Sequence, residues 1–184
     1  QGLPIDHIAS VASFFVSRID TLVDSRLGQI ISLGGAQASQ AAALQGKAAI
    51  ASARLAYADF KTFIATERWQ KLAAVGAQLQ RPLWASTSTK NPAYRDVLYV
   101  EELVGPHTVN TVPPQTLLAF LAHGEVRSGS LEEGVDDARH ALAELEGLGI
   151  NMGEVTGQLE AEGVKSFAEA FTVLLEGIEG RLQG

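Results

Sequence analysis

Only three segments of the sequence have the composition of β-strands, and long stretches with helical spacing separate them. The segments are residues 5–16, 77–88 and 107–112, of which the first is rich in β-branched and aromatic side chains, whereas Pro82 in the second is tolerable only near a strand's start. Strands that alternate with helices form parallel sheets, because each helix carries the chain back to the edge where the next strand starts. We therefore expect an α/β fold built on three parallel strands.

The segments between these strands repeat apolar residues at intervals of three or four, as amphipathic helices do. The most regular one covers residues 46–66, which are rich in Ala and contain no Pro. Further helices are predicted at residues 17–31, 67–77, 91–105, 113–124 and 131–149, and two more within 154–182. Asn91 and Pro92 suit the N-cap and first turn of the helix at 91–105.

A parallel sheet of three strands is too small to form a complete domain. Parallel sheets bury both faces, open edges invite pairing, and three strands cannot close into a barrel. The sequence is thus expected to be the rear part of an eight-stranded α/β barrel whose earlier strands are missing. The first residue is Gln1 and not Met, which fits a processed chain or a fragment. We expect residues 1–184 to hold no second domain.

Charge and composition narrow the classes of partner. The net charge of −7 argues against nucleic acid, because phosphate backbones bind basic surfaces, but it leaves room for a small phosphorylated ligand. The lack of Cys excludes disulfides, thiolate catalysis and cysteine–zinc sites, and it is compatible with the cytosol. No apolar run reaches the roughly 18–20 residues of a membrane span. We expect neither nucleic acid nor a membrane as a partner.

The stretch RPLWASTSTKNP, residues 81–92, carries most of the information about function. Four hydroxyl residues, 86–89, follow the predicted strand and lead into Lys90 and Asn91. Such a strand end could bind an anion, hold a reactive amine or form a solvated turn. A reactive amine needs a lowered pKa, from a dry pocket or a nearby cation, whereas hydroxyls beside an Asn-Pro turn favour the ammonium. We therefore expect anion binding.

Four stretches resemble the C-terminal half of a transaldolase of the longer bacterial type: VASFFVSRIDTLVD, GKAAIASARLAY, RPLWASTSTKNPAYRDVLYVEELVGP and HTVNTVPPQTL. The resemblance implies a class I aldolase-type (β/α)8 TIM barrel, of which this chain holds about strands six to eight. It implies a cytoplasmic enzyme of the pentose phosphate pathway that transfers a dihydroxyacetone unit between sugar phosphates through a lysine Schiff base, without metal or cofactor.

The same resemblance places the Schiff-base Lys and the acid–base carboxylates before Gln1. No catalytic residue is then expected in this chain, which alone would be inactive. Its partners would be sugar phosphates and the missing N-terminal half of the barrel. The last helix, with its apolar stripe, would pack across the barrel.

Residues at the end of the first strand match the family's substrate site. The resemblance implies that Ser13 contacts the substrate, that Phe15 lines the pocket and that Arg18 holds the phosphate. Ser13 and Phe15 should share one side of the strand, opposite Phe14. The planar fork of Arg suits a phosphate dianion.

Residues at the end of the second strand match the rest of that site. Ser88 and Lys90 fall where the family places a Ser and an Arg that also hold the phosphate, so here Lys replaces Arg. A slip of two residues in the alignment would put Ser86 in place of Ser88. Asn91 and Trp84 are further candidates, although Trp84 is expected mainly as a packing residue.

Other polar residues are expected to have structural roles. The four histidines are not at metal-ligand spacing: His7, His107, His123 and His140. Asp20 and Asp24 lie one helical turn apart, which could mimic a paired-carboxylate site, but we expect a solvated helix face.

Two hypotheses compete with the transaldolase assignment. The chain could be a non-catalytic half-barrel that pairs with itself or with another chain, because its open edges need cover. It could also belong to a related phosphosugar lyase or aldolase that lacks the transfer step.

Overall fold

The computed structural model describes residues 4–182, so Gln1 lies outside the described part of the chain. Its three strands form one parallel sheet in the order β1 (Ser10–Phe15), β2 (Gln80–Ala85), β3 (Val109–Asn110). β1 and β2 pair along their whole length, with Phe15 opposite Ala85 at the carboxyl end. β3 pairs only with Leu83 and Trp84 of β2. The predicted α/β class and the three parallel strands are confirmed.

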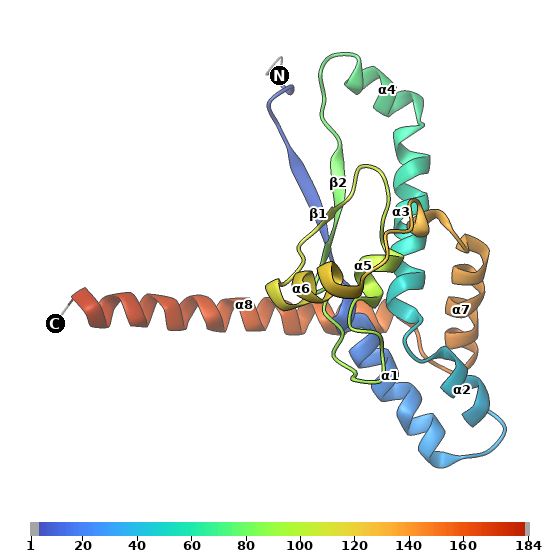
Figure 1. Ribbon diagram of the computed structural model, residues 1–184. Coiled ribbons are helices and arrows are strands. Elements are labelled where there is room, and N and C mark those ends of the chain that lie inside the picture. Colours follow the sequence, from blue (N-terminus) through green and yellow to red (C-terminus); the bar gives the residue numbers. More distant parts are fainter. Residues whose placement is uncertain (1–3, 183–184) are drawn as a thin grey trace.

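Helices make up most of the remaining described chain. They are α1 (Val16–Leu33), α2 (Ala38–Leu44), α3 (Ala48–Ile64), α4 (Glu67–Ala73), α5 (Leu98–Glu102), α6 (Pro114–His123), the 3₁₀ turn η1 (Ser130–Glu132), α7 (Val135–Gly147) and α8 (Met152–Leu182). Figure 1 shows α3 running beside the sheet, α7 on the outer side of α3, and α8 extending away from the other elements.

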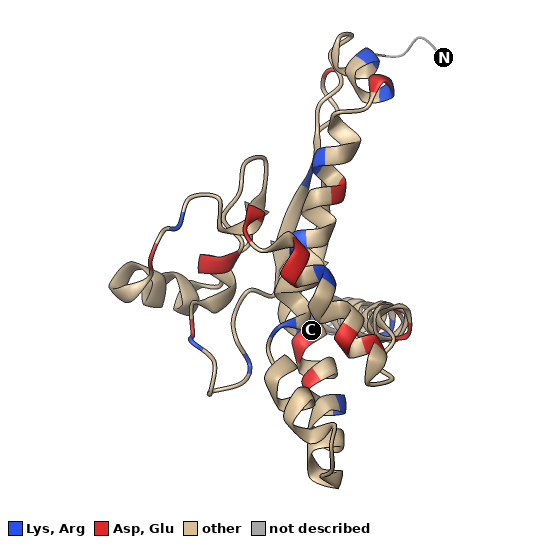
Figure 2. Ribbon diagram, turned by 90° about the vertical axis from the view of Figure 1, so that its right-hand side faces the viewer, with Lys and Arg blue, Asp and Glu red and all other residues tan. Residues whose placement is uncertain are grey.

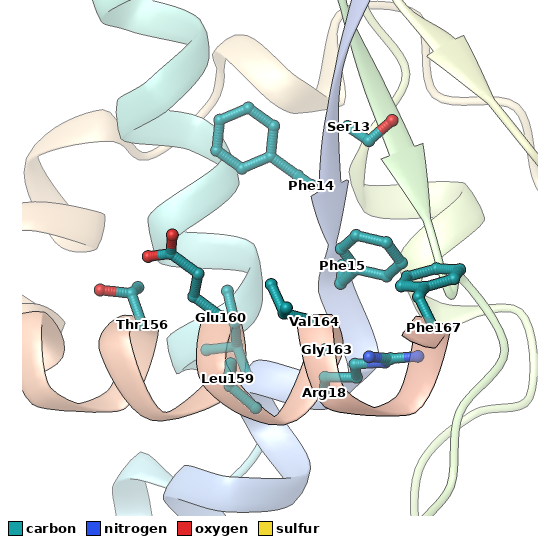
Figure 3. Close-up of a pocket in the computed structure, with 11 residues that line it drawn as sticks. Ser13, Phe14, Phe15, Arg18, Thr156, Leu159, Glu160, Gly163, Val164 and Phe167 are labelled. Atoms are coloured by element: carbon teal, nitrogen blue, oxygen red, sulfur yellow. The ribbon is translucent and has the colours of Figure 1, made fainter. Parts of the chain in front are cut away.

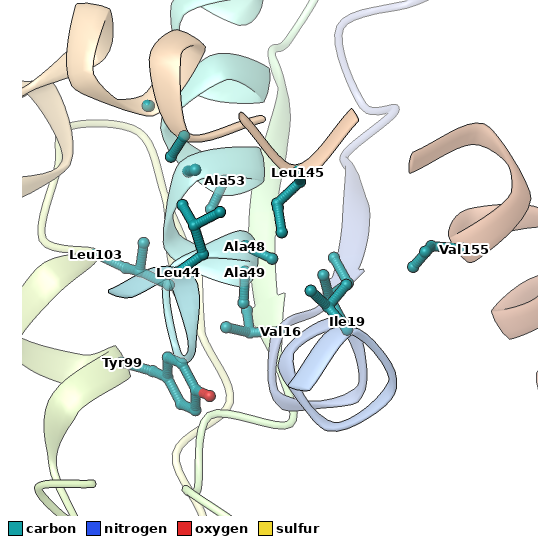
Figure 4. Packing of buried hydrophobic residues seen from close by; sticks show 14 of the residues in the cluster. Val16, Ile19, Leu44, Ala48, Ala49, Ala53, Tyr99, Leu103, Leu145 and Val155 are labelled. Carbon is teal, nitrogen blue, oxygen red and sulfur yellow. The ribbon is translucent and has the colours of Figure 1, made fainter. Parts of the chain in front are cut away.

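The core lies among α1, α2, α3 and α7, on one side of the sheet (Figure 4). Val23 and Leu27, one turn apart on α1, and Leu145 on α7 are completely buried. The buried face of α3 is built largely from alanines, which have the best helix propensity and let neighbouring helices approach closely. This arrangement explains why the Ala-rich segment, the most regular in the sequence, becomes the central helix.

The opposite face of the sheet is largely uncovered within residues 4–182. The ring of Phe14 faces the core and packs edge-on against Trp84, with ring centroids 5.4 Å apart. On the other face Val11 is 40% exposed, and Ser13 is also exposed. Parallel sheets in complete α/β proteins are covered on both faces. The fold is therefore consistent with part of a barrel whose interior side is open.

The helix predicted at 91–105 is wrong in extent, because helical structure begins only at α5. Asn91 is not an N-cap for it: its Oδ1 accepts a hydrogen bond from the backbone N–H of Ala93 at 2.9 Å. The N–H of Tyr94 also donates to the backbone oxygen of Asn91 at 3.1 Å. With Pro92 second in this four-residue segment, the Asn-Pro sequence forms a turn that is satisfied locally.

The last segment was expected to form two helices but forms one, the 31-residue α8. A helix interior tolerates an isolated Gly at a cost of about 1 kcal/mol relative to Ala, so the glycines of this segment do not end the helix. Within residues 4–182, no helix combines the length and the apolar character needed to cross a membrane. Lys and Arg are interspersed with Asp and Glu along the ribbon (Figure 2).

Candidate functional site

The candidate residues lie in the last residues of β1 and β2 or directly after them, and these strand ends lie at one edge of the sheet because the strands are parallel neighbours. The N–H of Ser17, in the first turn of α1, donates a hydrogen bond to the backbone oxygen of Ser86 at 3.1 Å. Ser86 has φ +56°, in the left-handed region that residues other than Gly seldom adopt. The two strand ends are thus joined directly through the backbone.

The first group of candidates lies between β1, α1 and α8 (Figure 3). Ser13 and Phe15 lie on the side of β1 opposite Phe14, as the strand alternation predicts. They line a largely apolar pocket of about 600 Å³ together with Arg18 and residues of α8. The ring of Phe15 lies 6.4 Å from that of Phe167 on α8, centroid to centroid.

Arg18 brings a positive charge to this pocket, which the carboxylate of Glu160 on α8 also lines. Its guanidinium carbon lies 4.8 Å from the centroid of the Phe15 ring, a cation–π contact. Within the described chain no carboxylate forms an ion pair with it. The guanidinium carries five N–H donors in a planar fork, which can bind an anion in this pocket.

The second group lies in the loop after β2. The ammonium of Lys90 donates a hydrogen bond to Oγ of Ser88 at 3.0 Å, and Lys90 is exposed. Thr87, between the candidate serines, is completely buried, and its hydroxyl donates to Oδ1 of Asn110 at the end of β3 at 2.8 Å. Thr87 and Asn110 were not recognised as part of this edge, since only their burial and contact distinguish them from the neighbouring hydroxyls.

The two groups line different pockets. Arg18 lines the pocket against α8, whereas Lys90 and Asn91 line a second pocket of about 310 Å³ beside α1. In residues 4–182 no hydrogen bond joins Arg18 to either Ser88 or Lys90, and the link between the groups is the Ser17–Ser86 backbone contact. Trp84, a further candidate, is completely buried against Phe14.

Two carboxylates beside the second pocket correct an expectation. Asp20 and Asp24 do not lie on a solvated helix face: Asp20 is 2% exposed and Asp24 is half-buried. The hydroxyls of Tyr99 and Tyr94 donate to them at 2.7 and 2.6 Å. Their spacing along α1 could not reveal this, because the covering residues come from the segment after β2, some 70 residues later in the chain.

Burial shifts the titration of this cluster. It raises the pKa of the Asp20 carboxyl from 3.8 to about 6, against the opposing hydrogen bonds from the backbone N–H of Ala49 and from Tyr99. Burial, together with the neighbouring carboxylates, also raises the pKa values of Tyr94 and Tyr99 above the usual range of a phenol. Both tyrosines are therefore hydrogen-bond donors at every physiological pH. Residues 4–182 hold no group of three His, Asp or Glu side chains that could bind a metal ion.

The shifted carboxyl predicts a distinct pH dependence of stability. Because folding raises the pKa of Asp20, its contribution to stability is complete below pH 3.8 and is lost as the pH rises through about 6. The free energy of unfolding should fall by roughly 3 kcal/mol across this window on account of Asp20 alone. Asp20→Asn should remove that part of the dependence, measured by urea unfolding between pH 4 and 7. Asp59→Asn, at an exposed carboxyl of α3, is the control. A curve for Asp20→Asn that runs parallel to the wild type would contradict this assignment.

Known sequences show similarity along nearly the whole chain. Residues 3–178 match the family described as Transaldolase/Fructose-6-phosphate aldolase. A transaldolase of Parafrankia sp. (strain EAN1pec) is 50% identical over 181 residues, 98% of this chain and 47% of the relative. Transaldolase 1 of Streptomyces avermitilis is 49% identical over 183 residues, 100% of this chain and 47% of the relative. A transaldolase of Mycolicibacterium smegmatis is 45% identical over 181 residues, which are 98% of this chain and 47% of the relative.

This chain therefore spans about half the length of the curated relatives it matches. The resemblance predicted from the strand-end motifs is confirmed, and an aldolase-type barrel is the fold that the match implies. With the match covering residues 3–178, the chain belongs to the transaldolase/fructose-6-phosphate aldolase family.

Proposed function

We propose that this chain forms the phosphate-binding side of a transaldolase active site, as about strands six to eight of a (β/α)8 barrel. The observation that carries the proposal is that cationic residues follow two adjacent parallel strands. Arg18 follows β1, and the hydrogen-bonded pair of Ser88 and Lys90 follows β2. Active sites of such barrels lie at the carboxyl ends of the strands.

The two strand ends line different pockets in this chain, and in the complete barrel they would bind one sugar phosphate in complementary ways. The guanidinium of Arg18 presents a planar fork of donors that fits two phosphate oxygens, whereas the ammonium of Lys90 acts as a compact charge. Because Ser88 accepts from Lys90, its own hydroxyl proton remains available to donate to the phosphate. Phe15 would supply an apolar wall beside the sugar carbons, and Ser13 a polar contact. This division holds the substrate by its phosphate and leaves its carbonyl to the rest of the barrel.

The covalent step would be carried out by a lysine upstream of this chain. A Schiff-base lysine must be free to attack the substrate carbonyl, but three of the five lysines here form ion pairs with carboxylates. They are Lys61, Lys71 and Lys165. By this proposal the chain alone is inactive and works with the remainder of the barrel.

Borohydride trapping tests the proposed function. The intact protein is treated with a dihydroxyacetone-bearing sugar phosphate and borohydride, and the adduct is mapped by peptide mass spectrometry. We expect one reduced adduct, on a lysine outside these 184 residues. An adduct on Lys90 or Lys47 would refute the division of roles between the two halves.

We propose self-association as a second candidate role for the chain by itself. The observations in its favour are the uncovered face of the sheet and the exposed apolar side chains on α8 and α6. On α8, Phe167 and Phe171 are 62% and 61% exposed, and Leu121 on α6 is 74% exposed. Large apolar side chains exposed in number are typical of an interface. Light scattering of the isolated chain should give a mass above 19.5 kDa. A compact monomer would contradict this role and leave the active-site proposal intact.

A further inference from the structure

Two carboxylates on α1 have the same set of hydrogen bonds, one helical turn apart. Oδ1 of Asp20 accepts from the backbone N–H of Ala49 at 2.8 Å, and Oδ2 accepts from the hydroxyl of Tyr99 at 2.7 Å. Oδ1 of Asp24 accepts from the N–H of Gly46 at 2.9 Å, and Oδ2 from the hydroxyl of Tyr94 at 2.6 Å. Each carboxylate thus joins three segments: α1, the turn before α3 or its first turn, and the segment after β2.

These two carboxylates face away from Arg18, the residue of α1 that the proposed function assigns to phosphate. Successive residues of an α-helix are about 100° apart, so Arg18 and Asp20 point to nearly opposite sides of α1. Arg18 lines the pocket against α8, whereas Asp20 and Asp24 line the pocket that Lys90 also lines. A segment that is hydrogen-bonded to Asp20 and Asp24 is therefore held at a fixed position relative to Arg18, because all three residues belong to the same helix.

The hydrogen bond between Tyr94 and Asp24 lies close to Lys90 along the chain. Tyr94 closes the turn that begins at Asn91, through its N–H and the backbone oxygen of Asn91 at 3.1 Å. Lys90 immediately precedes that turn. Holding the hydroxyl of Tyr94 on Asp24 therefore holds the turn, and with it the backbone that carries Lys90.

Gly46 leaves the space that the ring of Tyr94 needs to reach Asp24. Gly46 has φ +71°, and a Cβ at this position would lie 2.8 Å from Cζ of Tyr94. Real Cβ atoms do not approach so closely, so the Tyr94 ring reaches Asp24 only because residue 46 lacks a side chain. The same Gly46 supplies the N–H that binds the other oxygen of Asp24.

We infer that Asp20 and Asp24, with Tyr99 and Tyr94, are positioning residues that fix the loop carrying Ser88 and Lys90 relative to Arg18. The inference rests on the proposed function, because it assigns these groups to one phosphate. In the described chain neither carboxylate forms an ion pair with Lys90. Their oxygens already accept from phenols and backbone amides.

The test removes the two phenolic hydroxyls from the intact protein, as Tyr94→Phe combined with Tyr99→Phe. Tyr57→Phe is the matched control, because Tyr57 is also buried and its hydroxyl donates to Pro106, away from this cluster. We expect amide hydrogen exchange in residues 86–97 to become about tenfold faster, since two hydrogen bonds are lost there. Residues of α7 should keep their protection. The control should leave exchange in 86–97 unchanged.

Steady-state kinetics then test whether the position of the loop that carries Ser88 and Lys90 affects phosphate binding. In the double variant the inhibition constant of inorganic phosphate and the KM for the sugar phosphate should rise about tenfold, with kcat within about twofold. Tyr57→Phe should change neither constant. If the double variant fails to fold, Tyr94→Phe alone should show the same pattern with a smaller rise, because Tyr94 is the less buried of the two phenols.

Lys90→Ala separates the inference from the proposed function. If Lys90→Ala weakens phosphate binding but the tyrosine variants change neither exchange nor the constants, the inference is overturned and the phosphate site stands. If the tyrosine variants lower kcat as much as they weaken phosphate binding, their role is general stability and the inference is also overturned. If Lys90→Ala leaves phosphate binding unchanged, the proposed role of the loop fails, and the inference falls with it.

Discussion

Replacing Arg18 with alanine in the intact protein should raise KM for the sugar phosphate ten- to a hundredfold, with a much smaller change in kcat. Hydrogen bonds to charged groups contribute about 1.5–3 kcal/mol each, and at least one such bond to the phosphate is lost. The phosphate is remote from the reacting carbon and carries the same charge in the ground and transition states. Its loss therefore weakens binding more than chemistry.

Two further variants sharpen this test. Arg18→Lys keeps the charge but not the planar fork, so its KM should fall between those of the wild type and Arg18→Ala. Arg139→Ala removes an exposed arginine on α7 and should leave KM unchanged. Steady-state kinetics at fixed ionic strength measure all three. An unchanged KM in Arg18→Ala would remove Arg18 from the phosphate site, whatever the behaviour of Lys90.

Local sequence signals account for the sheet and for the strand-end residues. Strand periodicity requires Phe14 to face away from Ser13 and Phe15, and the sheet places Phe14 on the core side (Figure 3). The chain order of strands and helices is enough to make the sheet parallel. The family motifs lie at the ends of β1 and β2, so the sequence could locate Arg18 and Lys90 at one edge.

Contacts between distant segments account for what could not be predicted. An aspartate on an amphipathic helix has the same local pattern whether water or a tyrosine from another segment covers it. Only the fold brings Tyr99 to Asp20, 79 residues earlier in the chain. The turn at Asn91 was missed for a related reason: Asn before Pro suits both an N-cap and a turn, and the choice depends on where the helix is needed.

Replacing Trp84 with alanine should lower the free energy of unfolding by about 3–5 kcal/mol, the largest stability effect expected here. Trp84 lies in β2 opposite Phe14 of β1, is completely buried, and packs edge-on against the Phe14 ring. Its removal leaves a cavity between the sheet and the helices that β1 and β2 jointly support. Because Arg18 and Lys90 follow these two strands, the same variant should also weaken phosphate binding. Urea unfolding of the intact protein, followed by circular dichroism, measures the stability change.

Matched variants distinguish core packing from other effects of losing an indole. Trp69→Ala makes the same chemical change on α4, where Trp69 is half-exposed and its ring lies 6.0 Å from that of Phe63, so its cost should be much smaller. Trp84→Phe should also be milder than Trp84→Ala. The indole Nε1 of Trp84 has no hydrogen-bond partner in residues 4–182, so Phe loses only volume. Equal destabilisation by Trp84→Ala and Trp69→Ala would show that β2 does not pack on the core as described, and the joint placement of the two strand ends would lose its structural basis.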